Sequence, residues 1–154
     1  MKGQTHKKLC ARTSAFDSNF RAWKANPQSQ FLVRVPHSSG MLEGKYTLDT
    51  KFDENDHRSH RPRAWLVEGL QKVDRLKPLC DARGVTLGQL ALLWLYAHRS
   101  VLSALPNIYG SEQIEEFAAA SDHPPLTDAE MESIQKMYSR NFDVIPYVEQ
   151  AVSV

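Results

Sequence analysis

The chain has 154 residues, 42% of them hydrophobic and 24% charged, with a formal net charge of +1. This length is enough for one domain with a real core, and the composition is ordinary for a soluble globular protein. No apolar run approaches the roughly 18 residues that span a membrane, and the N-terminus lacks the apolar centre of a secretory signal. We therefore expect a cytoplasmic protein with no membrane partner.

The charge is unevenly placed. Residues 1–29 hold six of the 19 basic residues but only one acidic residue, Asp17. A basic arm can mark contact with nucleic acid, but these positive charges are scattered and form no motif. A solvated extension is the favoured interpretation, and we expect no nucleic-acid partner. The two cysteines, Cys10 and Cys80, form no CxxC pair and no disulfide framework, which suits a reducing compartment.

The first predicted elements surround a short strand. Three aromatic residues at helical spacing, Phe16, Phe20 and Trp23, indicate either a short amphipathic helix or a poorly ordered extension over residues 1–29. Residues 31–35 (FLVRV) are typical of a buried strand, which Pro36 ends because proline cannot donate to a sheet ladder. The loop that follows, up to Tyr46, is small, polar and glycine-containing, as expected where a strand end meets a ligand.

Two helices are expected after a long charged connection over residues 47–63. An apolar stripe predicts a helix over residues 65–83, which Pro78 should kink or split after Leu76 and which Gly84 should cap. Thr86 and Gln89 form a capping box for a helix over residues 87–98, which is apolar nearly all round and must be buried on several sides.

The remaining elements repeat the pattern of strand, loop and helix. Residues 101–106 (VLSALP) predict a second strand, and residues 112–120 a helix that Ser111 should cap. Thr127 and Glu130 open a last helix, to about residue 138, and residues 141–154 form a tail. The order βαβα predicts an α/β fold in which the two strands are parallel and the helices lie outside.

Three stretches in this order resemble the C-terminal half of the aldo/keto reductase family. They are VPHSSGMLEGKY, GVTLGQLALLWLYAHRSVLSALPN and SEQIEEF, and they are similar to the family's strand-seven loop, its helix and eighth strand, and its x-x-Q-(L/I)-x-E-N motif. The resemblance implies that residues 30–140 form a partial (β/α)8 TIM barrel that carries the last two strands. It also implies a nicotinamide dinucleotide cofactor, NADP or alternatively NAD.

The resemblance also implies which residues hold the cofactor. Its pyrophosphate should lie on the loop after the first strand, and its adenosine part beside the loop and helix after the second strand. The implied binding residues are Pro36, His37, Ser38, Ser39, Gly40, Lys45, Asn107, Tyr109, Gln113 and Glu116. Asn107 replaces a usual glycine, Tyr109 a usual basic residue for the 2′-phosphate, and Phe117 a usual asparagine, so the choice between NADP and NAD stays open.

The family's catalytic Asp, Tyr, Lys and His are absent from residues 1–29, and no tyrosine precedes Tyr46. Three hypotheses follow. The chain is the cofactor-binding half of a carbonyl reductase that works only when another chain supplies the catalytic half, a non-catalytic nucleotide-binding or regulatory module, or a truncated remnant. A half-barrel leaves strand edges open, so we expect a homo-oligomer or a complementary half-barrel partner.

Other functional patterns are weaker. The run D-x-x-D-H-x-x-H from Asp53 to His60 lacks the spacing of a standard zinc motif, so we expect no metal. Within the same connection, Arg58, Arg61 and Arg63 are either solvated or placed to reach the cofactor phosphates. His37 is read as a cofactor-loop residue rather than a catalytic base.

Overall fold

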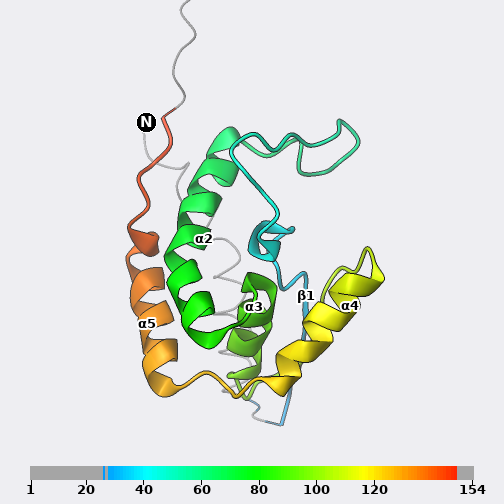
Figure 1. Ribbon diagram of the computed structural model, residues 1–154, viewed down its shortest axis with the longest axis vertical. Helices are drawn as coiled ribbons and strands as arrows, with labels where there is room; N and C mark the ends of the chain where they lie inside the picture. Colours follow the sequence, from blue (N-terminus) through cyan, green and yellow to red (C-terminus); the bar gives the residue numbers. More distant parts are fainter. Residues whose placement is uncertain (1–25, 27, 149–154) are drawn as a thin grey trace, which may run out of the picture.

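The computed structural model describes residue 26 and residues 28–148, in which helices surround a small sheet (Figure 1). The order of elements is β1 (Phe31–Arg34), η1 (Met41–Glu43), α2 (Arg63–Arg83), α3 (Leu87–Tyr96), β2 (Val101–Leu105), α4 (Ser111–Ala118), η2 (Ala119–Asp122), α5 (Asp128–Ser139) and η3 (Asn141–Asp143). The expected helix around Phe16, Phe20 and Trp23 lies outside the described residues. No helix in the described ranges has the length and apolar character needed to cross a membrane.

The described strands form one parallel pair, which confirms the expected α/β order. Phe31 pairs with Val101 and Arg34 with Leu105, with one irregularity in register between Phe31 and Leu32. Hydrogen bonds continue the pairing at both ends, from Phe31 N–H to the Ser100 carbonyl (2.7 Å) and from Val35 N–H to the Leu105 carbonyl (3.3 Å). Both strands therefore end at the same edge of the sheet.

One face of this sheet carries exposed leucines. Leu32, Leu102 and Leu105 are 58%, 60% and 48% exposed, whereas Val101 and Ala104 on the same strands are buried against the helices. Parallel sheets normally have both faces covered, so three large apolar side chains on an open face are unusual.

Helix α3 joins the two parts of the core. One cluster packs α3 against α2, η1 and α5, through residues that include Trp65, Leu66, Leu90 and Leu93. The other packs α3 against β2 and α4, through Leu92, Leu95, Val101, Ala104, Phe117 and Ala120. Helix α3 is therefore covered on both sides by other elements. This agrees with the prediction that a helix apolar nearly all round is buried on several sides.

The predicted caps are mostly present. Both capping boxes form, with Thr86 and Gln89 at the start of α3 and Thr127 and Glu130 at the start of α5. Gly84 ends α2 in the left-handed conformation (φ 64°). The predicted Ser111 cap is wrong: α4 begins at Ser111 itself after Gly110, and no side chain caps it.

The C-terminal residues of the described part lie along α2. Gln71 holds Ile145 at both backbone groups, accepting from its N–H (2.9 Å) and donating to its carbonyl (3.1 Å). Glu68 accepts from the Tyr147 N–H at 3.1 Å. Side chains of α2 thus form hydrogen bonds with the backbone of this segment and hold it against the helix.

Helix α2 runs through Pro78 without interruption, so the predicted split after Leu76 is wrong. Pro78 is exposed, and so is Asp74, whose carbonyl loses its helical partner because proline has no N–H. Water can satisfy that carbonyl. Val73 and Cys80, on either side of Pro78 in the sequence, are buried in the core, so both halves of the helix are packed.

We expect Pro78→Ala to stabilise the protein. The substitution restores one helical hydrogen bond and removes the ring's steric penalty, which together should outweigh the added freedom of the unfolded chain, for a net gain of roughly 1–2 kcal/mol. Urea denaturation measures the change. Pro125→Ala, in the loop before α5, is the matched control and should lower stability slightly; an unchanged or lower stability for Pro78→Ala would contradict the expectation.

Candidate functional site

The loop after β1 has an unusual backbone. Val35, Ser38 and Ser39 adopt positive φ values of 54°, 52° and 61°, and Gly40 follows at 87°. Each non-glycine residue in this region costs about 1–3 kcal/mol and persists only where its surroundings fix it. A hydrogen bond from the Ser38 N–H to the Val35 carbonyl (3.2 Å) closes the turn. Such strain is concentrated at ligand sites.

His37 anchors this loop to the core. Its side chain is 2% exposed, its Nε2 lies 3.2 Å from the Gly88 carbonyl, and its ring centroid lies 4.3 Å from that of Phe117. Burial lowers the pKa of His37 below 6.5, although the Gly88 carbonyl and the carboxylates of Glu43 and Glu116 oppose the shift. A neutral ring that donates from Nε2 fits these contacts.

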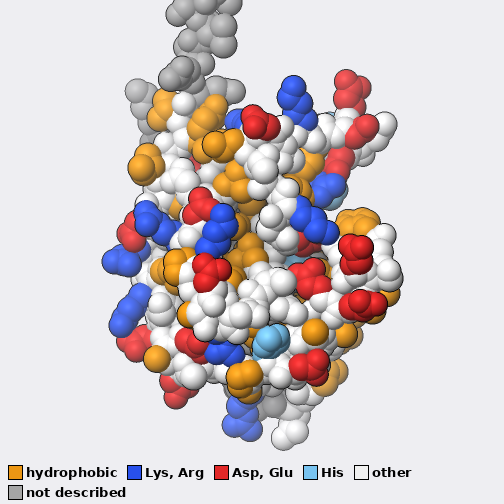
Figure 2. Space-filling model, in the orientation of Figure 1, with side chains coloured by type: hydrophobic (Ala, Val, Ile, Leu, Met, Phe, Trp, Pro, Cys, Tyr) orange, Lys and Arg blue, Asp and Glu red, His pale blue; other side chains and the backbone are white. Residues whose placement is uncertain are grey.

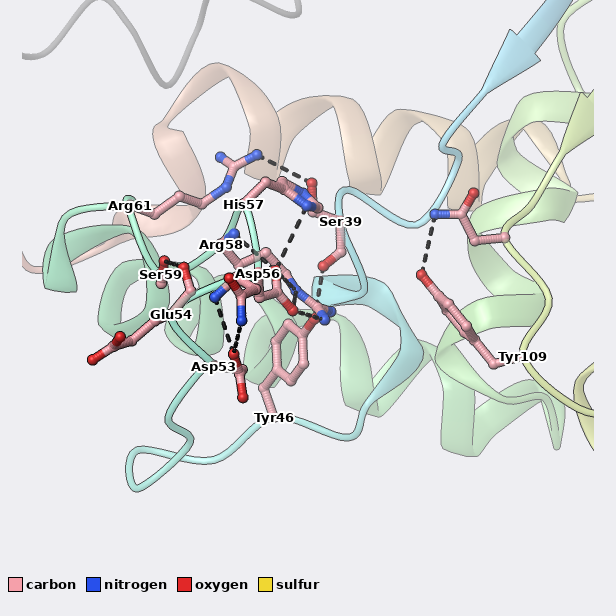
Figure 3. A network of polar contacts seen from close by, with 12 residues as sticks. Ser39, Tyr46, Asp53, Glu54, Asp56, His57, Arg58, Ser59, Arg61 and Tyr109 are labelled. Atoms are coloured by element: carbon pink, nitrogen blue, oxygen red, sulfur yellow. Dashed lines mark hydrogen bonds and ion pairs between the residues drawn. The ribbon is translucent and has the colours of Figure 1, made fainter.

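The charged connection between η1 and α2 folds back onto the loop (Figure 3). Tyr46 donates its hydroxyl hydrogen to the Ser39 carbonyl (2.7 Å), and Arg58 donates to the Tyr46 hydroxyl oxygen. The Arg58 Nε lies 2.8 and 2.9 Å from the two Asp56 carboxylate oxygens, and this guanidinium holds the pKa of Asp56 well below its usual range. Arg58 also stacks on Phe52, 4.9 Å from the ring centroid.

Arg61 lies beside the same loop. Its Nη2 donates to the Ser39 hydroxyl oxygen at 3.1 Å, and its guanidinium lies 4.6 Å from the centroid of the Trp65 ring. Because Trp65 is buried at the start of α2, the stacked guanidinium is held at a fixed position over the turn.

Gln113 of α4 connects the loops that follow the two strands. Its side chain is 5% exposed, accepts from the Tyr109 N–H at 2.8 Å and donates to the Glu43 carboxylate at 3.1 Å. Within the second loop, the Asn107 amide lies 3.4 Å from the Tyr109 hydroxyl. Residues 43 and 109 are thus held together by one amide.

A cavity of about 150 Å³ lies between these loops, lined by Val35, Ser39, Gly40, Glu43, His57, Arg58, Arg61, Asn107 and Tyr109. Figure 3 shows Tyr109 across from the cluster of Ser39, Arg58 and Arg61. Sites for drug-sized ligands are typically about 300–1,000 Å³. The cavity therefore has room for part of a larger ligand, such as a phosphate and its adjoining sugar, while the rest of that ligand lies along the surface.

The structure brings some of the residues implied by the resemblance together and separates others. Ser39, Gly40, Asn107 and Tyr109 line the cavity, with Gln113 directly behind it. Pro36, His37, Ser38 and Lys45 do not line it; Pro36 and Ser38 are half-buried and Lys45 is exposed.

Glu116 and Phe117 contact the start of α3 and do not line the cavity. The Glu116 carboxylate accepts from the Thr86 hydroxyl at 2.6 Å, and its carbonyl accepts from the Gln89 amide at 2.9 Å. Phe117 is buried with His37 and close to Gly88. Both residues therefore hold α4 against the start of α3.

Two residues of the site were not singled out from the sequence. Glu43 lines the cavity, and the Tyr46 hydroxyl fixes the turn at Ser39. The available signal was their position in one short loop. Glu43 lies between Gly40 and Gly44, and Tyr46 follows Gly44 and Lys45.

Comparison with known proteins gives one consistent group. The Aldo/keto reductase family model matches residues 20–139. The chain is 35% identical over 96 residues to a probable voltage-gated potassium channel subunit beta of Arabidopsis thaliana, covering 59% of this chain and 29% of that protein. It is 29% identical over 105 residues to an NADP(+) aldo-keto reductase of Schizosaccharomyces pombe, covering 66% and 31%.

A solved structure has the same fold. A glycerol dehydrogenase from Gluconobacter oxydans aligns with a TM-score of 0.66 at 20% identity, over 82% of this chain and 38% of the dehydrogenase. The chain thus spans about three tenths of the length of the curated relatives it matches.

We expect Gly40→Ala to destabilise the loop more than Gly44→Ala. Both glycines have positive φ, but a Cβ at residue 40 would lie 2.4 Å from the Tyr46 hydroxyl, whereas one at residue 44 meets nothing within 4 Å. Backbone strain alone costs about 1 kcal/mol, so Gly44→Ala should lose roughly that and Gly40→Ala roughly 2–3 kcal/mol. Chemical denaturation measures both, and equal losses would show that the Tyr46 contact does not matter.

Proposed function

Because the chain belongs to the aldo/keto reductase family, we propose that it binds a nicotinamide dinucleotide between the loops after β1 and β2. In this proposal it is the cofactor-binding part of an oxidoreductase that reduces aldehydes or ketones to alcohols. The observation that carries the proposal is the cavity itself, in which a strained strand-end turn and two arginines meet the loop of the second strand.

The end of the cavity nearest β1 is suited to phosphate. The Ser39 and Gly40 N–H groups take no part in the described backbone hydrogen bonds, and successive N–H groups in a left-handed turn form an anion-binding concavity. Arg61 is fixed beside them, and a guanidinium recognises phosphate oxygens through paired donors. Arg58 is paired with Asp56 and donates to the Tyr46 hydroxyl, which holds the Ser39 carbonyl. The pyrophosphate of a dinucleotide is the natural ligand for this end.

The implied binding residues then divide into two groups. We propose that Ser39, Gly40, Asn107 and Tyr109 contact the cofactor, while Pro36, His37, Ser38, Gln113 and Glu116 hold the two loops in place. Lys45 lies outside the cavity and would meet the cofactor only through its long, exposed side chain.

The described cavity lacks the tyrosine–lysine pair with which the family delivers the proton of a carbonyl reduction. The family's Asp, Tyr, Lys and His have no counterpart in residues 1–29, and the described residues that line the cavity include Tyr109 but no lysine to pair with it. When bound, the cofactor supplies hydride, and this chain's own residues bind and orient it. We propose that catalytic residues come from a second segment that completes a (β/α)8 barrel.

The exposed sheet face supports this completion. Leu32, Leu102 and Leu105 would face the interior of a closed barrel, and the outer edges of β1 and β2 would each gain a neighbour. A second copy of the chain and a complementary half-barrel are the two partners that we consider.

A second candidate function is regulation. Two plant relatives, 35% and 33% identical, are named probable voltage-gated potassium channel subunits beta. A chain that binds the nucleotide without turning it over would fit a regulatory subunit that responds to the nicotinamide pool. Turnover measurements separate this candidate from the first.

We expect the 154-residue chain to bind a nicotinamide dinucleotide and not to oxidise NADPH with a carbonyl substrate when alone. Titration with NAD⁺ and NADP⁺, followed by tryptophan fluorescence, should be saturable because Trp65 lies beneath Arg61. Arg61→Met should weaken binding by about tenfold or more through loss of a charge-assisted contact, and Arg75→Met, on the exposed side of α2, should not. No saturable change with either nucleotide would refute the proposal.

We expect the chain to self-associate through its open sheet face. Leu102→Lys places a charge there and should shift the population towards the monomer in sedimentation velocity, at protein concentrations where the wild type is associated. Leu48→Lys alters a leucine of similar exposure in the connection before α2 and is the control. A wild-type chain that stays monomeric and stable at high concentration would count against a barrel completed by copies of itself.

A further inference from the structure

The cavity is electrically polarised. Of the residues that line it, Arg61 donates to Ser39 and Arg58 to the Tyr46 hydroxyl, whereas the Glu43 carboxylate is held by Gln113 beside Tyr109 of the second loop. A nucleotide bound across this cavity presents groups of different chemistry to the two ends. The phosphates of the nucleotide suit the basic end. The part of the nucleotide that lies beside Glu43 then decides which nucleotide binds.

The Glu43 carboxylate is held in one orientation. It lies in η1, between two left-handed glycines, and its N–H donates to the Gly40 carbonyl at 3.1 Å. Its Oε2 accepts from the Gln113 amide at 3.1 Å. That amide cannot turn over, because its own oxygen already accepts from the Tyr109 N–H. One carboxylate oxygen is thus occupied and the other is left as a hydrogen-bond acceptor.

Within the described residues, the second loop and α4, which hold the Glu43 carboxylate in place, provide no cation for a second phosphate. The second loop, residues 106–110 (PNIYG), has no basic residue, and α4 continues with Glu112 and Glu115. Figure 2 shows acidic side chains gathered over α4. Arg58, which also lines the cavity, is already paired with Asp56. A phosphate at this end would therefore face the Glu43 carboxylate.

We propose that Glu43 accepts hydrogen bonds from the 2′- and 3′-hydroxyls of an adenosine ribose and rejects a 2′-phosphate. A carboxylate that binds a ribose diol is the general device for selecting NAD over NADP, because the 2′-phosphate brings nearly two negative charges to the same point. This assignment rests on the proposed function. It makes NAD(H), rather than NADP(H), the nucleotide of this chain.

The test compares ligands that differ only in the 2′-phosphate. Isothermal titration calorimetry with the 154-residue chain measures the dissociation constants of NAD⁺ and NADP⁺, and of AMP and adenosine 2′,5′-bisphosphate. We expect the unphosphorylated member of each pair to bind at least tenfold more tightly. Glu43→Gln keeps an oxygen for the Gln113 amide but removes the charge, and it should reduce this preference at least tenfold.

Glu132→Gln is the matched control, because it makes the same charge change on the exposed side of α5, away from α4 (Figure 1). It should leave the preference unchanged. Should Glu43→Gln fail to fold, the two wild-type comparisons decide the matter alone.

Equal or tighter binding of the 2′-phosphorylated ligands by the wild type would overturn the assignment to Glu43 while leaving the proposed function standing. A preference that Glu43→Gln does not change would also overturn it. Failure of all four ligands to bind would overturn the proposed function and this assignment with it.

Discussion

The parallel pairing of β1 with β2 is the constraint on which the rest of the structure depends. In a parallel pair the carboxyl ends of both strands lie at one edge, so the loops that begin at Val35 and Pro106 are brought together although about 70 residues separate them. Gln113 then joins the loops through a single buried amide. Without this register, the arginines of the long connection and the second loop would share no cavity.

Helix α3 makes the pairing stable in so small a sheet. An isolated pair of strands is marginal in water, and here α3 covers one face while it also packs on α2, α4 and η1. Polar contacts at the start of α3 also stabilise this arrangement. The Thr86 hydroxyl oxygen accepts from the Gln89 N–H in the capping box, and the hydroxyl donates to Glu116, so the start of α3 is bonded to α4. The site is supported from behind by the core.

Local patterns in the sequence predicted most of the fold. The two capping boxes, the Gly84 end of α2, the short strands and the nearly all-apolar α3 each depend on residues within a few positions of one another, and each is present. The continuous α2 at Pro78 was missed because burial on the far side of a helix, which the helix's own sequence does not specify, can hold it together through a proline.

The site was less predictable, for a related reason. The resemblance located the two loops, but which side chain faces the cavity depends on partners far away in sequence. Glu116 turns to Thr86, 30 positions earlier, and His37 turns to Gly88, 51 positions later. Glu43 acquires its position from Gln113, 70 positions later. A short sequence motif cannot reveal contacts between residues that lie 30 to 70 positions apart.

The run of left-handed residues at Val35, Ser38 and Ser39 has a consequence for the evolvability of this protein. Glycine or asparagine would relax each of these positions, so stabilising changes are available in the middle of the proposed binding loop. Such changes would keep the backbone geometry that presents the N–H groups and lower its steric cost. At residue 39, however, they would remove the hydroxyl that accepts from Arg61, so thermal robustness and the placement of this guanidinium are competing demands on one side chain.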